Sequence, residues 1–266
     1  MSCLLLILVS AGMKVFDMSP ADVDTFLSDL RGREADFGAR VVAVAERSLD
    51  TPYANGPLGE GPTGKYDTDP LIDLTKVDCV TFLEQTFALA MAKDYQEAFD
   101  TLQRIRYRDG VIDFETRNHF MIADWVANNR FCQDVSAELG VATDSVTRTI
   151  SKRAYFPKVN APELGQDTPD RDITLQYVPV DKATAAVAKM PTPALVVFIG
   201  KVDWLFALHC GLFVRDSCGA GLLYHASSKA GKVVRVDFAA YVEEQSSRYL
   251  GFTAYALSDA PETPKE

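Results

Sequence analysis

Cysteine and histidine are scarce in this chain of 266 residues, which holds five cysteines and three histidines. No Cys-x-x-Cys arrangement occurs, and the cysteine spacings match no zinc pattern, so we expect neither a metal site nor a cofactor. Because the number of cysteines is odd, at least one is free or bonded to another chain. Disulfides among Cys132, Cys210 and Cys218 stay open at this point.

Basic residues are fewer than acidic ones: the chain has 27 Lys and Arg and 37 Asp and Glu, which gives a net charge of -10. This acidic balance argues against nucleic acid as the main partner. Low-complexity tracts and internal repeats are absent, and 47% of the residues are hydrophobic, so the chain can bury a sizeable core. We expect a single domain over residues 13–266.

Long apolar runs are missing beyond the N-terminus, so we expect no stable insertion into a membrane. The start, from Ser2 to Ala11, is apolar and ends in small residues, which is typical of the core of a secretory signal. It lacks the basic start of such signals, and the alternative is a buried N-terminal segment. We interpret residues 1–12 as a signal segment, which predicts a periplasmic or otherwise exported protein. The oligomeric state is not indicated.

Helix signals fill the N-terminal half. Ser19-Pro20 combines a capping serine with a proline at the first helical position, and Asp78 opens a segment with one apolar face. The glycine-rich and proline-rich stretch 51–70 is typical of a long loop, a kind of segment that is often functional. Helices are predicted at residues 19–30, 34–48, 78–91, 95–105 and 119–129.

The C-terminal part changes character. Residues 157–181 carry several prolines and few periodic signals, and we predict them to be irregular apart from a short strand at 176–180. After them come short β-rich segments separated by turn residues. Helices followed by antiparallel strands indicate an α+β fold. The later strands are predicted at residues 194–199, 207–214, 221–226, 232–236 and 252–257.

Cys79 directly follows Asp78 at a predicted helix start. The helix dipole and the unpaired backbone N–H groups at that position favour a thiolate, and the same N–H groups can hold an oxyanion. A histidine brought to this thiol by the fold would complete a Cys-His nucleophile pair, as in a cysteine amidase or peptidase.

Two histidines lie on neighbouring predicted strands. A hairpin turn centred on residue 217 would set His209 directly opposite His225, so that one imidazole orients the other. Alternation along the strand puts Cys210 on the opposite face from His209, which directs its thiol away from the site. Gly211 leaves room for a helix end to approach. A lone cysteine or histidine is more often structural, so the hypothesis depends on the combination.

In this order, the Asp78-Cys79 pair, the segment 209–214 and the segment 223–228 resemble the NlpC superfamily of papain-like cell-wall hydrolases. Within it, the chain is most similar to the N-acetylmuramoyl-L-alanine amidase-like family, from about Ser19 to Leu257. The resemblance implies a papain-like fold in which N-terminal helices pack on a C-terminal antiparallel sheet. The segments that carry the narrower likeness are 51–53, 56–59, 78–84, 106–110, 117–120, 124–125, 128–129 and 177–179.

The resemblance implies Cys79 as the nucleophile, His209 as the general base and His225 as the residue that orients the base. Tyr53 falls where a tyrosine lies beside the nucleophile, and its hydroxyl and the N–H of Cys79 would bind the oxyanion. The equally weighted alternative is a packing tyrosine at the end of a loop. Asp78 precedes the nucleophile as the first residue of the helix start.

The segment Arg117-Asn118-His119 is characteristic of the narrower family, and we expect it near the substrate cleft. Arg117 suits bidentate recognition of a peptide carboxylate. The alternative is a helix start that Asn118 caps, with a solvated arginine. His119 is the second choice as base. Arg106 and its neighbours form a basic cluster that is either solvated or attracts an anionic substrate.

We therefore expect a cysteine amidase that cleaves the bond between the lactyl group of N-acetylmuramic acid and L-alanine, through a thioacyl enzyme. Its partners would be peptidoglycan fragments, the muropeptides. An endopeptidase that cuts γ-D-glutamyl to diamino-acid bonds would use the same three residues. An enzyme that transfers the acyl group to an amine, or a non-catalytic module that binds peptidoglycan, would also fit the fold.

Overall fold

The computed structural model describes residues 12–259, so nearly all of the predicted signal segment lies outside the described residues. The long helices begin at capping side chains. Ser19 forms a capping box with Asp22, and Asp78 forms one with Thr81, as the two predicted helix starts require. These helices are α1 (Pro20–Arg33), α2 (Phe37–Arg47), α3 (Cys79–Met91) and α4 (Tyr95–Arg106).

The strands form one antiparallel sheet in the order β2-β3-β8-β4-β5-β6-β7, and β1 pairs with β8 outside this path. The mixed α/β architecture with an antiparallel sheet, predicted from the sequence, is confirmed. The strands are β1 (Cys132–Asp134), β2 (Asp144–Ile150), β3 (Arg171–Pro179), β4 (Ala194–Gly200), β5 (Ala207–Arg215), β6 (Gly221–Ser227), β7 (Lys232–Asp237) and β8 (Tyr249–Leu257).

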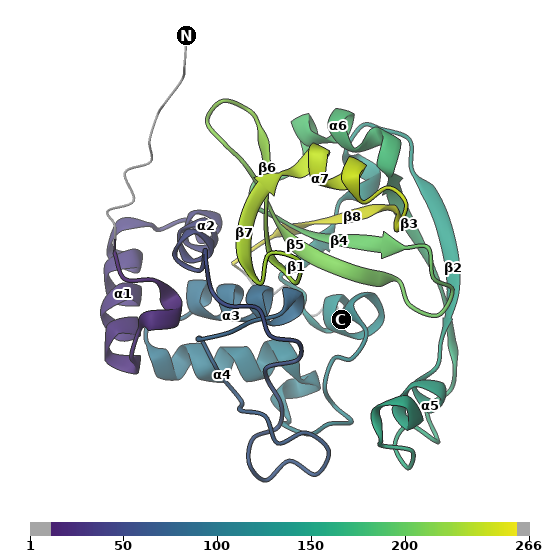
Figure 1. Cartoon of the computed structure of the whole chain (residues 1–266), viewed down its shortest axis with the longest axis horizontal. Coiled ribbons are helices and arrows are strands. Elements are labelled where there is room, and N and C mark those ends of the chain that lie inside the picture. Colours follow the sequence, from purple (N-terminus) through teal and green to yellow (C-terminus); the bar gives the residue numbers. More distant parts are fainter. Residues whose placement is uncertain (1–11, 260–266) are drawn as a thin grey trace, which may run out of the picture.

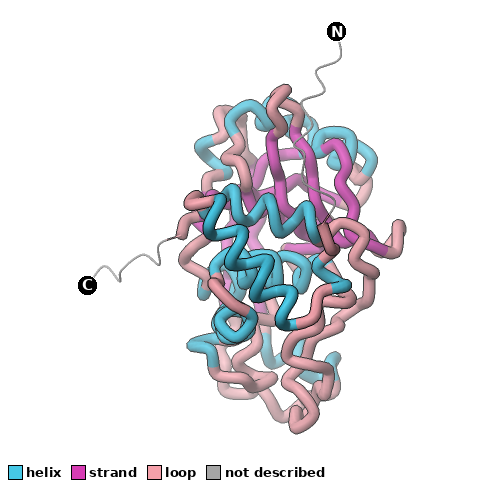
Figure 2. The backbone as a smooth tube through the Cα atoms, turned by 90° about the vertical axis from the view of Figure 1, so that its left-hand side faces the viewer, coloured by secondary structure: helices cyan, strands magenta, loops and turns pink. Residues whose placement is uncertain are grey.

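Helices cover both faces of the sheet. On one face, α1 to α4 share a core with inward-facing residues of β4, β5 and β6, whereas the other face packs on α6 and α7 (Figure 1). Figure 2 shows the helical segments gathered against the strands. The shorter helical elements include α5 (Lys152–Tyr155), α6 (Ala183–Ala186), α7 (Phe238–Glu244), a π-helical turn (Met121–Val126) and several 3-10 turns, among them Phe156–Val159.

Two segments differ from the prediction. The stretch 157–181 contains the whole of β3, of which only a short strand at 176–180 was predicted. Residues 171–177 of β3 pair with β2, a pairing that the sequence pattern did not indicate. In β3, Ile173, Leu175 and Tyr177 pack on the core between exposed polar residues, so this strand does alternate, and the prediction recognised only its end. In β2 the inward face is interrupted by buried Arg148, which weakens the apolar signal. The helix predicted at 119–129 begins two residues later, and its first part is π-helical.

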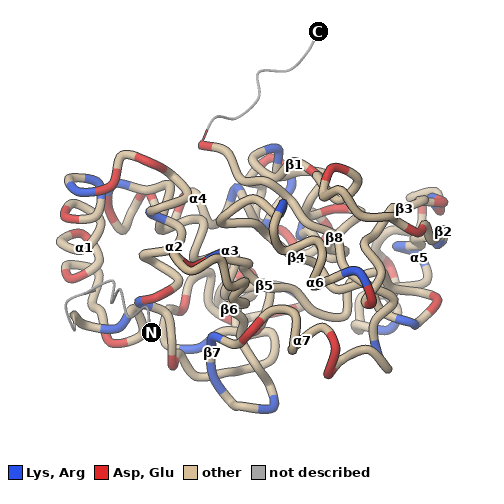
Figure 3. The backbone as a smooth tube through the Cα atoms, turned by 90° about the horizontal axis from the view of Figure 1, so that it is seen from above, with Lys and Arg blue, Asp and Glu red and all other residues tan. Residues whose placement is uncertain are grey.

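Charged residues of both signs are interspersed over the outer helices and loops (Figure 3). Among residues 12–259, no helix combines the length and the apolar character that a membrane crossing requires.

Candidate active site

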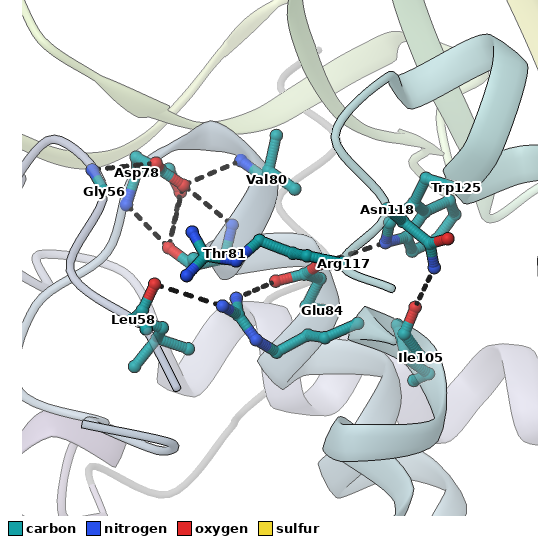
Figure 4. Close-up of polar contacts among 12 residues, drawn as sticks. Gly56, Leu58, Asp78, Val80, Thr81, Glu84, Ile105, Arg117, Asn118 and Trp125 are labelled. Carbon is teal, nitrogen blue, oxygen red and sulfur yellow. Dashed lines mark hydrogen bonds and ion pairs between the residues drawn. The ribbon is translucent and has the colours of Figure 1, made fainter. Parts of the chain in front are cut away.

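Cys79 is the first residue of α3, and its neighbours use most of the amides of the first turn. One carboxylate oxygen of Asp78 accepts the amides of Val80 and Thr81 at 3.1 and 2.8 Å, and the other accepts the amide of Gly56 at 3.1 Å (Figure 4). The amide of Cys79 has no acceptor among the described residues. The helix start therefore keeps one backbone donor available beside the thiol.

His209 and His225 contact each other through their rings. Nε2 of His209 lies 2.8 Å from Nδ1 of His225, and the two rings are nearly perpendicular, at 87°. The imidazole of His209 lines the same cleft as the thiol of Cys79 and lies close enough to lower the pKa of that thiol. Because Nε2 of His209 is engaged by His225, Nδ1 is the nitrogen left for the sulfur. The thiol and both imidazoles thus form one chain of contacts.

The register of the hairpin is shifted from the prediction. Leu212 pairs with Tyr224, so the turn is centred on residue 218 and the two histidines are diagonal rather than directly opposite. A two-residue offset keeps both side chains on one face, which is why their rings still meet. A Cβ on Gly211 would stand 2.7 Å from Cδ1 of Leu223 and 2.8 Å from the carbonyl oxygen of Tyr224, so this glycine makes room for the neighbouring strand β6 rather than for a helix end.

The surroundings lower the pKa values of two groups, with different chemical consequences. The neighbouring Cys210 thiol first, and then the His209 imidazole, outweigh the effect of burial and lower the pKa of Cys79 to about 5, so the sulfur is a thiolate at neutral pH. Burial, together with the nearby charge of His209, lowers the pKa of His225 to about 3. His225 therefore stays neutral and can accept a hydrogen bond from Nε2 of His209.

Cys210 was predicted to face away from the site, and the structure corrects this. Its side chain does lie on the face opposite His209, but α3 packs on that same face, and the Cys210 thiol reaches the carbonyl of Cys79 at 3.3 Å. A bulge in the pairing of β4 with β5 leaves Leu208 without a partner residue on β4. At this bulge, His209 and Cys210 line the same cleft although they lie on opposite faces of the strand. Cys132 and Cys210 are free thiols, so neither forms a disulfide.

A small cleft of about 150 Å³ lies at the nucleophile. Segments 118–121 and 205–208 supply its two walls, and α3 and β5 bring the thiol and the imidazole to it. Its lining residues are Cys79, Val80, Asn118, His119, Met121, Leu205, Ala207, Leu208, His209 and Cys210.

Tyr53 lies close enough to the nucleophile for their charges to interact. Burial first, and then the negative charge of Cys79, raise the pKa of its phenol, so Tyr53 keeps its proton at neutral pH. Its backbone amide donates to Gly231 at 2.9 Å, which ties the start of the 51–70 loop to the sheet. Its hydroxyl has no hydrogen-bond partner among the described residues, so the phenol is available as a donor.

His119 lines the cleft but its ring nitrogens are already engaged. Nε2 lies 2.6 Å from the carbonyl of Phe114 and Nδ1 lies 3.3 Å from the hydroxyl of Tyr155. Burial lowers the pKa of this imidazole to about 3. His119 is therefore a neutral wall residue within an aromatic cluster, while His209 holds the contact with the thiol.

Arg117 and Asn118 are engaged by the protein itself. The guanidinium of Arg117 binds Glu60 at 2.6 Å and Asp67 at 2.8 Å, which fastens the long loop to this segment. Binding of a peptide carboxylate by Arg117 would have to displace one of these partners. Asn118 donates to the carbonyl of Ile105 at 2.9 Å and caps no helix (Figure 4).

A buried ion pair joins α3, the helix that begins at Cys79, to the end of α4. Glu84 binds Arg106 at 2.7 Å and accepts the indole N–H of Trp125 at 3.0 Å, while Arg106 also donates to the carbonyl of Leu58 at 3.1 Å (Figure 4). Both charged side chains are 4% exposed. Arg106 is therefore not part of a surface cluster, because its partner lies inside the core.

Residues that the sequence did not suggest complete the surroundings of the histidines. Phe198 stacks on His209 at 6.0 Å, and Tyr241 of α7 lies 4.9 Å from the ring of His225. In the sequence, these two residues stand out only as members of apolar strand or helix segments, which does not indicate a place in the site. Within residues 12–259, no three His, Cys, Asp or Glu side chains gather in a group able to hold a metal ion.

Solved structures share this fold. A protein from Legionella pneumophila superposes with a TM-score of 0.82 at 20% identity, over 92% of this chain and 95% of that one. An N-acetylmuramoyl-L-alanine amidase from Bacteroides uniformis gives 0.67 at 24% identity, over 84% and 99%. A putative xylanase from Bacteroides fragilis gives 0.63 at 24% identity, over 80% and 98%. No curated protein matches the sequence significantly.

The sequence itself matches a family model. Residues 43–251 fit the AmiA-like model, described as N-acetylmuramoyl-L-alanine amidase-like. This match contains Cys79, His209 and His225, and it covers well over half of the chain. The protein therefore belongs to the AmiA-like family of N-acetylmuramoyl-L-alanine amidase-like proteins.

Proposed function

We propose that this protein is a cysteine amidase that hydrolyses the bond between the lactyl group of N-acetylmuramic acid and L-alanine in peptidoglycan fragments. The observation that carries the proposal is the chain of contacts from the Cys79 thiol through His209 to His225. The family match supports the substrate class. A cysteine at a helix start and a histidine on a strand also support a papain-like fold of the NlpC type.

In the first step, the Cys79 thiolate attacks the carbonyl carbon of the amide, and the carbonyl oxygen becomes an oxyanion. The free amide of Cys79 and the hydroxyl of Tyr53 are the two donors available for it. Such a donor stabilises the transition state by about 3 kcal/mol. Because both donors already point from fixed backbone and loop positions, little reorganisation accompanies the attack.

In the second step, protonated His209 gives its proton to the alanine nitrogen, the C–N bond breaks and the peptide amine leaves. A thioester to the lactyl group remains on Cys79. His209 then takes a proton from water, the hydroxide attacks the thioester, and the lactyl carboxylate departs as the thiolate reforms. Neutral His225 accepts a hydrogen bond from Nε2 of His209 throughout, so it holds the ring orientation that both proton transfers need.

Digestion of a defined muropeptide, with mass spectrometry of the products, tests the proposal. The wild-type protein should release free sugar and the whole peptide, whereas Cys79→Ala should release neither. Cys132→Ala removes a buried thiol on β1, away from the cleft, and serves as the matched control that keeps turnover. Appreciable hydrolysis by Cys79→Ala would refute the mechanism.

The same digest distinguishes the amidase from the competing functions. A sugar-dipeptide and a shortened remainder would identify a γ-D-glutamyl endopeptidase instead. A protein without turnover whose Cys79 is not alkylated quickly at neutral pH would be a binding module.

Export also stays a proposal, tested by fractionating cells that express the full chain and sequencing the N-terminus of the recovered protein.

A further inference from the structure

The cleft at the nucleophile is too small for a whole muropeptide. Its volume of about 150 Å³ falls below the roughly 300 to 1,000 Å³ of pockets that enclose complete small ligands. It can hold the groups around the reacting amide, so the sugar and the distal peptide must lie on the rim. One part of the rim is the loop between β4 and β5, because Leu205 near its end and Leu208 at the start of β5 line the cleft.

Trp204 stands on this loop and is unusually exposed. Its exposed fraction is 55%, whereas that of Trp125, the second tryptophan of the chain, is 1%. Leaving a large apolar ring in water forgoes the stabilisation that burial would give. Trp204 directly precedes Leu205, which lines the cleft, and exposed aromatic rings are a common feature of surfaces that bind ligands or partners.

The loop that presents Trp204 is anchored at both ends. Buried Arg148 of β2 donates to the carbonyl of Gly200 at 2.6 Å and to the carbonyl of Leu205, and its guanidinium lies 5.2 Å from the ring centre of Phe206. An arginine that binds both ends of a short loop limits the positions the loop can take. The indole is therefore presented from a fixed base, which lowers the entropy lost when a ligand covers it.

Lys158 places a cation against the same ring. Its amine lies 5.0 Å from the ring centre of Trp204, and no carboxylate of the described residues forms an ion pair with it. Lys158 lies two residues after Phe156, whose ring centre is 5.2 Å from that of His119, another residue that lines the cleft. The Lys158–Trp204 contact therefore joins the elements behind both walls of the cleft.

We propose that Trp204 and Lys158 form a sugar-binding subsite on the rim, in which the open face of the indole takes the pyranose ring of the muramic acid. This inference rests on the proposed function, because it assigns the sugar side of the same substrate. The C–H groups on one face of a pyranose are apolar and match an aromatic face. The ammonium orients the indole by the cation–π contact and can donate hydrogen bonds to hydroxyls at the edge of the sugar.

Steady-state kinetics with two substrates tests the subsite. One is a muramyl peptide and the other is the matching lactoyl peptide, which has the same reacting amide and no sugar. For Trp204→Ala, KM for the muramyl peptide should rise about ten-fold more than KM for the lactoyl peptide, with kcat nearly unchanged. Trp204→Phe should recover much of the loss, and Lys158→Met should show a smaller change of the same kind.

Val111→Ala removes another exposed apolar side chain, 56% exposed, and is the matched control. It should leave the ratio of the two KM values at the wild-type level. Equal KM changes for both substrates in Trp204→Ala, or no change in either, would overturn the subsite.

A binding measurement separates this inference from the proposed function. Cys79→Ala is titrated with N-acetylmuramoyl-L-alanine while tryptophan fluorescence is followed, and buried Trp125 provides the constant background. A saturable change that disappears in Cys79→Ala/Trp204→Phe supports the subsite, even if the digest shows no amidase activity. Failure to see that change overturns the subsite, even if the digest shows the expected products.

Discussion

The first two turns of α3 carry two polar regions with opposite properties. At its start, the thiol of Cys79 has a lowered pKa and its amide has no acceptor among the described residues, so this region keeps reactive groups available. Further along, Glu84 is surrounded by partners: Arg106 at 2.7 Å and the indole of Trp125 at 3.0 Å. One helix thus presents a nucleophile with one end and fastens two other segments with the next turn.

The difference shows what the family-like segments do. Segments 56–59, 78–84, 106–110 and 117–120 meet in contacts among themselves. Arg106 binds Glu84 and donates to the carbonyl of Leu58, and the carbonyl of Arg106 accepts the amide of Asn118. These contacts hold the long loop, and with it Tyr53, against the start of α3. Most of the sequence likeness therefore describes the support of the site, and only a few residues can take part in the chemistry.

The largest effect should come from the reactive region. His209→Ala removes the group that moves both protons, so kcat/KM should fall by about a thousand-fold or more, while the free energy of unfolding changes by about 1 kcal/mol or less. Muropeptide kinetics and urea unfolding measure the two quantities. Activity above a tenth of the wild-type value would mean that another base serves Cys79, and His119 would then be the residue to replace.

The supporting region should respond in the opposite way. Arg106→Met leaves Glu84 buried without its cation, so the free energy of unfolding should fall by roughly 3 to 5 kcal/mol, while kcat/KM per folded molecule stays near the wild-type value. Arg104→Met is the matched control, because Arg104 lies on the same helix but is exposed. A change of about 0.5 kcal/mol or less is expected there. Similar stability of the two variants would contradict the scaffold role.

A smaller effect is expected at the second imidazole. His225→Gln keeps an acceptor near Nε2 of His209 but changes its position, so kcat/KM should fall about ten- to a hundred-fold, mostly in kcat. Because the pKa of His225 is about 3, its own titration should not contribute a limb to the pH profile between about pH 5 and 8. His225→Ala should lower kcat/KM further than His225→Gln does. Partial retention of kcat/KM in the Gln variant would show that His225 positions the ring of His209 rather than only packing against it.

Local signals were sufficient for the elements that the site needs. The capping residues at Ser19 and Asp78 fixed two helix starts, and the alternation in 207–214 and 221–226 put both histidines on one face. These predictions depend on nearest neighbours along the chain, which is why they succeeded. The shift of the hairpin centre by one residue belongs to the turn itself, whose geometry the composition of 216–221 leaves open.

Contacts between distant segments could not be predicted. Nothing near Arg106 indicates that Glu84, 22 residues earlier, neutralises it in the core. The pairing of β2 with β3 was missed although Ile173, Leu175 and Tyr177 alternate with polar residues in β3. Its partner β2 has a charged arginine on the inward face and is separated from β3 by helical and loop segments, so no local signal joins the two strands. Cys210 was assigned to the correct face, but the sequence did not show that α3 occupies that face.

The smallest and most specific effect concerns that thiol. Cys210→Ala removes the neighbouring thiol that contributes most to the lowered pKa of Cys79, so this pKa should rise above its value of about 5 while His209 still favours the thiolate. The rate of alkylation of Cys79, followed on its own peptide by mass spectrometry, should then show a midpoint at higher pH. The acid limb of kcat/KM should move in the same direction.

Cys132→Ala is the control for this change, because Cys132 is a buried thiol whose pKa is raised by burial and which does not line the cleft. In Cys132→Ala, the pH midpoint for alkylation of Cys79 should equal that of the wild type. If Cys210→Ala left the midpoint unchanged as well, the imidazole and the helix start alone would set the thiolate. The pKa of Cys79 would then depend on His209 on one face of β5 and not on Cys210 on the other. The contact of Cys210 with the carbonyl of Cys79 would contribute only to packing.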